Sequence, residues 1–209
     1  MSITANDLYE DGPAAGAKAK ILLIHFDGAI DAGGAGRMAI GQMLRSLHNE
    51  RVATFDADML MDYRSHRPII TVEDWVSSPD MVMPQTVLDL VEDDMGNPIL
   101  VLHGAEPDAH WESFTNAISG ICERAGVEIT FSLHGVPSGV PHTRPTPVHV
   151  QATDASLLPV GGVKITNHMQ FPAPLSTFVQ IRMGQRGVGG LALLGAVPYY
   201  MADTGYPAA

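Results

Sequence analysis

Residues 20–36 read KILLIHFDGAIDAGGAG, and they hold the first half of a β–α–β unit. The apolar run KILLIHF has the continuous hydrophobicity of a strand that is covered on both faces of a sheet. The turn rich in glycine and aspartate opens a helix, in which apolar residues recur from Ile40 to Leu47 at the spacing of one helical face. VATFD (52–56) is the next predicted strand. This alternation predicts an α/β fold.

A second unit repeats this order further along the chain. PILVLHG (98–104) is a predicted strand, and a helix is predicted to begin near Pro107, which suits a first helical turn. Gly126 is placed to end that helix. VEITFSL (127–133) then alternates apolar and polar residues, as expected for a strand with two different faces.

The remaining signals predict a mixed, mainly parallel sheet. Met95-Gly96-Asn97-Pro98 is turn material between two strand-like runs, and it predicts an antiparallel hairpin within the sheet. Residues 146–152 and 190–197 are predicted strands, and residues 175–184 are a predicted helix. The segment 57–80 has no clear assignment.

Composition favours one domain, residues 1–209, in a reducing compartment. The chain has 209 residues, of which 45% are hydrophobic and 17% are charged, enough for a large core. A net charge of −11 argues against general binding to nucleic acid or to an anionic membrane surface, which needs clustered lysine and arginine. Cys122 is the single cysteine, and no apolar run is long enough to cross a bilayer. We therefore predict a cytoplasmic protein.

The candidate site residues follow the ends of the predicted strands. Carboxyl ends of parallel strands share one edge of a sheet, and ligands of open α/β folds bind there. The residues expected at this edge are Asp27, Gly28, Asp31, Gly33 and Gly34 after the first strand, His103, Gly104, Glu106 and Asp108 after the second unit's first strand, and His134 with the loop to Arg144 after the alternating strand.

Each acidic candidate has two interpretations. Asp31 caps the following helix, or the DGAIDAGGAG turn holds an anion at the helix N-terminus; the turn lacks the dinucleotide and phosphate-loop motifs. Glu106 and Asp108 complement a helix start or form an acid/base pair. Trp111 is a core residue or a stacking platform. In each case the structural interpretation is favoured.

Metal and nucleophile motifs are absent from the sequence. His25, His103 and His134 each end a strand, but there is no HExxH or CxxC spacing to support a metal site. No G-x-S-x-G elbow is present, and Cys122 lies mid-helix, where a buried thiol is usually inert. We predict no metal, no cofactor and no catalytic residue.

The loop HGVPSGVPHTRP (134–145) is stiffened by its prolines, which lowers the entropy lost when it docks on a partner. His142, Thr143 and Arg144 form its polar tip. Arg144 either clamps a carboxylate of a ligand or partner, or pairs with an acidic residue of the protein itself. The sequence leaves both alternatives open.

Five stretches together carry a family resemblance. They are FDGAIDAGGAG (26–36), FDADMLMDYRSHRP (55–68), HGAEPDAHWESF (103–114), HGVPSGVPHTRP (134–145) and VPYYMADTGYPAA (197–209). In this order they resemble the proteasome assembly chaperone two family, in its bacterial, actinobacterial-type branch. The resemblance implies a three-layer α/β/α fold akin to nucleoside phosphorylases and related hydrolases. It also implies homo-oligomers, often trimers.

The eukaryotic and archaeal relatives that the chain resembles help to assemble proteasome α-subunits and are not enzymes. The resemblance implies a shared surface made of Asp31, Ala32 and Gly33, of Tyr63, Arg64 and Arg67, of Glu106, Pro107, Asp108 and Trp111, and of residues 141–145. Three departures stand out. The chain ends Pro-Ala-Ala instead of hydrophobic–Tyr–any, relatives tend to continue into a helical segment, and Ala29 stands where an aromatic is often found.

Two functions are therefore expected from the sequence. The first is a non-catalytic interaction or assembly protein whose partner is a protein, with proteasome subunits and further copies of the chain as candidates. The second is a small-molecule enzyme or sensor that binds a phosphate- or nucleoside-like ligand at the polar edge. A third possibility is that this edge is mainly a subunit interface.

Overall fold

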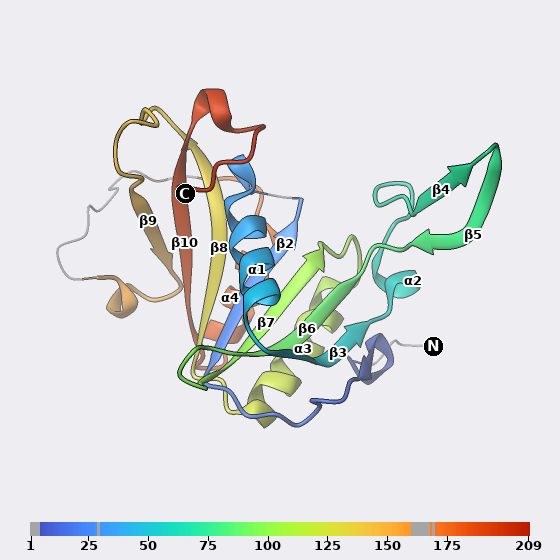
Figure 1. The fold of residues 1–209 in the computed structure, drawn as a ribbon. Helices are drawn as coiled ribbons and strands as arrows, with labels where there is room; N and C mark the ends of the chain where they lie inside the picture. Colours follow the sequence, from blue (N-terminus) through green and yellow to red (C-terminus); the bar gives the residue numbers. More distant parts are fainter. Residues whose placement is uncertain (1–4, 29, 160–167, 169) are drawn as a thin grey trace.

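An eight-stranded sheet runs through the computed structural model, which describes residues 5–28, 30–159, 168 and 170–209 (Figure 1). The strand order across the sheet is β1-β3-β6-β7-β2-β8-β10-β9. The strands are β1 (Tyr9–Asp11), β2 (Ile21–Asp27), β3 (Asn49–Phe55), β6 (Thr86–Glu92), β7 (Pro98–Ala105), β8 (Ile129–Ser138), β9 (Val148–Ala152) and β10 (Gly189–Pro198).

The centre of the sheet is parallel and its flanks are antiparallel. Strands β7, β2, β8 and β10 pair in parallel, while β6 joins β7 through the hairpin predicted at residues 95–98. Strand β3 is antiparallel to β6, so it runs in the same direction as β2. The carboxyl ends of β2, β3, β7, β8 and β10 therefore lie at one edge, which we call the rim. The predicted mixed α/β fold is confirmed.

Helices cover both faces of the sheet and make three layers (Figure 1). Helix α1 (Ala35–Ser46) lies on one face, and α3 (Trp111–Ala125) and α4 (Leu175–Gly184) lie on the other. The short elements are η1 (Ala5–Leu8), η2 (Ala32–Gly34), α2 (Ala57–Leu60), η3 (Ala155–Leu157) and η4 (Tyr199–Met201). Within the described residues, no helix is long and apolar enough to cross a membrane.

The larger core lies beneath α3. Phe114 of α3 is fully buried, and its ring centroid lies 4.7 Å from that of Phe55 and 6.1 Å from that of Phe26. Contacts of this kind add to the free energy gained from burial of the rings. Cys122 is buried in the same helix, and burial raises the pKa of its thiol to about 12, which keeps the thiol protonated.

The polar residues of β8 are buried, although such alternation is typical of a strand with one face in solvent. Thr130 and Ser132 have no exposed surface, because they face Gln180 of α4. The hydroxyl of Ser132 lies 3.2 Å from the Gln180 Oε1, and the Gln180 Nε2 donates to the Leu191 carbonyl at 3.0 Å. Buried polar groups are stable when they find such partners.

The start of α3 differs from the prediction. The helix begins at Trp111, not at Pro107, and His110 before it has a left-handed φ of 58°. The reason is a tertiary contact, since the N–H groups of Asp108 and Ala109 both donate to the carbonyl of Leu60. The predicted end at Gly126 is confirmed, with a φ of 84° in the helix cap.

A two-stranded hairpin projects from the body and lies mostly in the segment 57–80, which the sequence left unassigned (Figure 1). It is formed by β4 (Ile69–Glu73) and β5 (Val76–Val82), and we call residues 69–82 the arm. Glu73 pairs with Val76, so Asp74 and Trp75 make a two-residue turn with φ values of 49° and 64°. These signs are those of a type I′ turn, which favours Asn-Gly or Asp-Gly. A tryptophan in this conformation is strained.

Candidate functional site

Asp31 fastens the turn after β2 to its surroundings. Its Oδ1 accepts hydrogen bonds from the N–H groups of Gly36 at 2.8 Å and Gly135 at 3.0 Å, and its Oδ2 accepts one from Arg37 at 3.0 Å. Gly36 and Arg37 belong to the first turn of α1, so the side chain does the capping work predicted for it, although Gly34 is the N-cap residue. Two of the N–H groups that an anion could use at this helix start are thereby taken.

Two glycines allow the turn and α1 to approach the sheet closely. A Cβ on Gly135 of β8 would lie 1.9 Å from the carbonyl oxygen of Ala32, and a Cβ on Gly36 would lie 2.4 Å from the Nδ1 of His25. Neither position tolerates a larger residue without a shift of its neighbours. The predicted glycine-rich turn is therefore a close backbone contact with β2 and β8.

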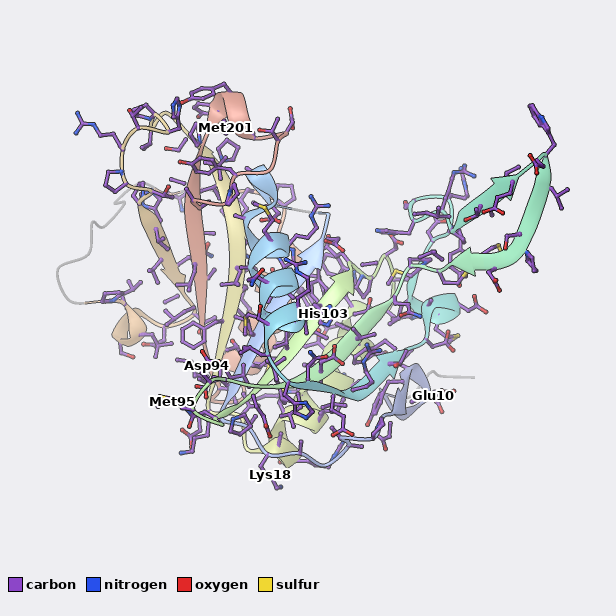
Figure 2. The ribbon with its side chains drawn as sticks, in the orientation of Figure 1. Glu10, Lys18, Asp94, Met95, His103 and Met201 are labelled. Carbon is purple, nitrogen blue, oxygen red and sulfur yellow. The ribbon has the colours of Figure 1, made fainter. Side chains whose placement is uncertain are left out.

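The segment after β10 joins this turn to the proline loop. The Gly33 N–H donates to the Ala202 carbonyl at 2.6 Å, and the Tyr206 N–H donates to the Gly33 carbonyl at 2.8 Å. On its other side, the Tyr200 hydroxyl lies 2.7 Å from the His142 Nδ1. Loops distant in sequence thus meet at the rim, as the shared strand direction predicts. Figure 2 labels Met201 at this place.

A cavity of about 520 Å³ lies between the turn and this segment. Predicted residues and new ones share its lining, which consists of Asp27, Gly28, Asp31, Gly33, Gly34, Arg37 and residues 202–205. The charged groups among them are three aspartates, including Asp203, and one arginine. Ala29, where the family often has an aromatic residue, lies outside the described residues.

Glu106 and Asp108 bind backbone groups, but not those of α3. Asp108 Oδ2 accepts the Asp62 N–H at 2.7 Å and lies 2.9 Å from the His66 Nδ1, so it holds the loop after α2. Glu106 Oε1 accepts the N–H of Leu175, the first residue of α4, at 2.6 Å. The helix-start interpretation is thus wrong for α3, because both carboxylates reach elements that are remote in sequence.

The three strand-end histidines have different hydrogen-bond partners, although His25 and His103 are register partners on β2 and β7. His103 Nε2 lies 2.8 Å from Asp89 Oδ2, and His25 Nδ1 lies 3.1 Å from the Leu133 carbonyl. His134 contacts the Ile30 carbonyl at 3.0 Å and the Ser132 hydroxyl at 3.1 Å. Across the described part of the chain, no group of three or more His, Cys, Asp or Glu is arranged to hold a metal ion.

The remaining predicted residues divide into packed and free ones. Trp111 packs on Phe178 with ring centroids 5.5 Å apart, and its Nε1 donates to the Pro107 carbonyl at 2.6 Å, which fits a packing role. Thr143 and Arg144 are exposed in the proline loop, and Arg64 and Arg67 are exposed just before the arm. Within residues 5–28, 30–159, 168 and 170–209, no ion pair engages these three arginines.

Sequence reasoning missed a charged cluster on the α1 face of the sheet. Asp89 in the middle of β6 contacts Arg51 Nε at 2.5 Å and His103 Nε2 at 2.8 Å, and it is 4% exposed. These two contacts lower the pKa of Asp89 in spite of the opposing effect of burial, which is the largest single influence. A lone aspartate inside the apolar run TVLDLVE was the signal that pointed to a partner.

Substitution of Glu106 tests whether this residue stabilises the protein through its hydrogen bond to the start of α4 or through its charge. Burial, with the nearby Asp108 charge, raises the pKa of Glu106 against the opposing hydrogen bond from Leu175. We expect Glu106→Gln to keep an acceptor for Leu175 and to change the unfolding free energy by less than about 0.5 kcal/mol, whereas Glu106→Ala should lower it by about 1 kcal/mol. Chemical denaturation of both variants measures the difference.

The pH dependence provides the control for this interpretation. The native state holds the Glu106 proton more tightly than the unfolded state does, so this residue's contribution to stability falls as pH rises through its raised pKa. Above about pH 5, the stability of the Glu106→Gln variant should therefore increase relative to that of the unmodified protein. An equal loss of stability in the Gln and Ala variants would contradict the capping role.

Comparison with known proteins places this geometry among solved structures. The model of the PAC2 family matches residues 25–209. A Mycobacterium tuberculosis protein of unknown function is 34% identical with a TM-score of 0.87, covering 97% of this chain and 70% of its own. A Corynebacterium glutamicum protein of unknown function is 30% identical with a TM-score of 0.86, and the match covers 96% and 76% of the two chains.

A third structure shares the fold at lower identity. It is described as a Mycobacterium tuberculosis proteasome-assembly chaperone homologue, is 23% identical with a TM-score of 0.80, and the match covers 90% of this chain and 79% of that one. A search of curated proteins gives no match.

Proposed function

Because this chain belongs to the PAC2 family, we propose that it acts by binding proteins, as an assembly factor that catalyses no reaction. A Mycobacterium tuberculosis protein with this fold is described as a proteasome-assembly chaperone homologue. We extend that description to this chain as a proposal, with proteasome subunits as the partner and further copies of the chain as the second partner, in a trimer.

The arm is the observation that carries this proposal. Nearly every residue of the arm is exposed, including Ile69, Val76 and Val82 at 65–69% and Trp75 at 98%. A two-stranded hairpin of this kind is marginally stable alone, and exposed apolar patches mark sites of protein contact. A strained, fully exposed tryptophan at its tip has the character of an interface anchor.

The two edges of the arm differ in a way that supports contact through β4. Strand β5 contains Pro79 and a register shift between the pairs at Ile70 and Val72, and both features block pairing with another strand. Strand β4 reads IITVE, which is rich in β-branched residues and has no proline. We propose that the β4 edge and the apolar side chains of the arm form the contact between copies.

The rim supports a role without catalysis. Its acidic residues Asp31, Glu106 and Asp108 are engaged with backbone N–H groups of the protein itself. Ser176 lies 3.3 Å from the His134 Nε2, but the serine is 1% exposed and the histidine 7%, so a substrate does not reach them. These groups stabilise loops and α4, and do not present a nucleophile.

The test is a double variant of the arm, Trp75→Gly with Val72→Thr. Glycine after Asp74 suits the type I′ turn, so the variant removes apolar surface while it keeps the hairpin geometry. Native mass spectrometry should show an oligomer for the unmodified protein and a monomer for the variant. When mixed with proteasome α-subunits of the same organism, the unmodified protein should form a complex.

Met95→Ser is the matched control, because Met95 is 83% exposed in the turn between β6 and β7, at the opposite edge of the sheet from Met201 (Figure 2). This variant should behave as the unmodified protein in both measurements. A monomeric unmodified protein would overturn the role of the arm in self-association. Absence of any complex with the α-subunits would overturn the proposed partner.

A second candidate function is the binding of a small molecule at the rim, and the cavity beside Asp31 supports it. A phosphate- or nucleoside-like ligand would meet three aspartates there and one arginine. Aspartates repel a phosphate, so this lining favours a ligand with positive charge. The interaction function is the better supported of the two, because Asp31 and Gly33 in the cavity lining already form hydrogen bonds with backbone groups of the protein itself.

A further inference from the structure

His25 presents a buried lone pair with no partner. Its side chain is 3% exposed, and its Nδ1 lies 3.1 Å from the carbonyl oxygen of Leu133. A carbonyl only accepts hydrogen bonds, so Nδ1 carries a proton, and when the ring is neutral the Nε2 is an acceptor. Among the described residues, Nε2 has no hydrogen-bond partner. Leaving such an atom unpaired is costly in a folded protein.

Two carboxylates of the cavity lining face the same nitrogen. Asp31 Oδ2 lies 3.6 Å and Asp27 Oδ1 lies 4.0 Å from the His25 Nε2. Both distances exceed those of a hydrogen bond. With a neutral His25 ring, three acceptors thus converge without a donor between them. A ligand group that donates hydrogen bonds to all three acceptors needs several N–H donors, and a positive charge suits the two carboxylates.

The rest of the cavity narrows the choice of ligand. Arg37 lines it as the single cation, with its guanidinium near Gly34, and no ion pair within the described residues engages it. Arginine binds carboxylates through paired N–H donors. Asp203 and Thr204 add acceptors to the lining. The lining therefore suits a ligand that carries an ammonium group and a carboxylate.

We propose that this cavity binds a small zwitterion of the amino-acid type. Its primary ammonium group, with three donors, lies between Asp27, Asp31 and the His25 Nε2, and its carboxylate lies on Arg37. Asp27 has a side chain that is 56% exposed, so entry requires a rotation of this side chain and leaves the fold unchanged. The free N-terminus of a peptide offers the same chemistry as a free amino acid.

The proposal is tested by calorimetry with three matched probes at millimolar concentration. They are 4-aminobutanoate, which has both groups, n-butylamine, which has only the ammonium, and butanoate, which has only the carboxylate. The first should bind most tightly, the second more weakly and the third not at all. Triglycine and N-acetyl-triglycine, added in the same way, separate a peptide N-terminus from a free amino acid.

Two variants test which residue binds the ammonium group of the ligand and which binds its carboxylate. Asp27→Asn should weaken 4-aminobutanoate and n-butylamine by about tenfold or more, the loss expected for one charged hydrogen bond. Arg37→Gln should reduce the affinity for 4-aminobutanoate to that for n-butylamine. Glu10→Gln, at the far edge of the sheet in β1, is the control and should bind all probes as the unmodified protein does (Figure 2).

Two results would overturn the proposal. The first is the absence of heat with every probe while the protein stays folded, as judged by its thermal transition. The second is binding of butanoate as tight as that of n-butylamine, which would make the cavity an anion site. Neither result bears on the arm, whose contacts are measured separately by native mass.

Discussion

Gly135→Ala is expected to lower the free energy of unfolding by about 3 kcal/mol, because the new Cβ has no room at the rim. It would lie 1.9 Å from the Ala32 carbonyl oxygen, 2.9 Å from the carbonyl carbon and 3.1 Å from the Ala32 nitrogen. All three are backbone atoms, so no side-chain rotation relieves the overlap. The turn after β2 has to move away from β8.

That movement breaks further contacts. Asp31 loses the N–H of residue 135, and the His134 contact with the Ile30 carbonyl is lengthened. We expect the thermal midpoint to fall by on the order of 10 °C for a chain of this size, which differential scanning calorimetry measures. The cavity beside Asp31 should open at the same time.

Gly139→Ala is the matched control in the loop after β8. A Cβ on Gly139 meets no atom within 4 Å, and the residue is exposed without a left-handed φ. Its stability should stay within about 0.5 kcal/mol of the unmodified protein. If both variants were equally stable, the close approach of the turn to β8 would not hold in solution.

The sequence correctly predicted the strands and helices whose hydrophobic pattern fits a single type of secondary structure. The run ILLI (21–24) is apolar without a break because β2 is paired on both sides and covered on both faces. Residues 175–184 were predicted as a helix, and α4 has these bounds. The start of α3 was mispredicted because Pro107 suits a first turn by propensity, while the Leu60 carbonyl claims the N–H groups that follow it.

The arm could not be predicted with the same rules. Its turn is Asp74-Trp75, and the positive φ of a type I′ turn is ordinarily read from glycine or asparagine. Pro79 in β5 also argues against a strand when read alone. Both features fit an isolated hairpin that is exposed on its two faces.

At the rim, the sequence predicted which loops lie together, but it did not predict which groups form hydrogen bonds. The shared strand direction correctly brought Asp31 and the proline loop onto one edge, with Tyr200 and Tyr206 as links that pattern reasoning did not single out. It could not show that Glu106 reaches the start of α4 at Leu175, since this contact spans 69 positions. Long-range hydrogen bonds of this kind leave no periodic signal.

Asp89→Asn is expected to cost about 3 kcal/mol of unfolding free energy near neutral pH. Removal of one partner from a buried charged cluster leaves the others without compensation. The value lies at the lower end for such clusters, because the Arg51 side chain is 36% exposed and water solvates part of its charge. Urea denaturation of the two proteins measures the difference, and Glu92→Gln, exposed on the same strand, should leave stability unchanged.

The pH dependence separates the charge of Asp89 from its packing. Arg51 and His103 hold the pKa of Asp89 below its usual value, so the native state binds this proton more weakly than the unfolded state. The contribution is then fully present above about pH 4 and is lost as pH falls through the lowered pKa. The gap between Asp89→Asn and the unmodified protein should therefore shrink in acid, as pH falls through this lowered pKa. Asparagine has nearly the shape of aspartate and differs from it in charge, so a gap that stays the same at every pH would contradict the role of the Asp89 charge.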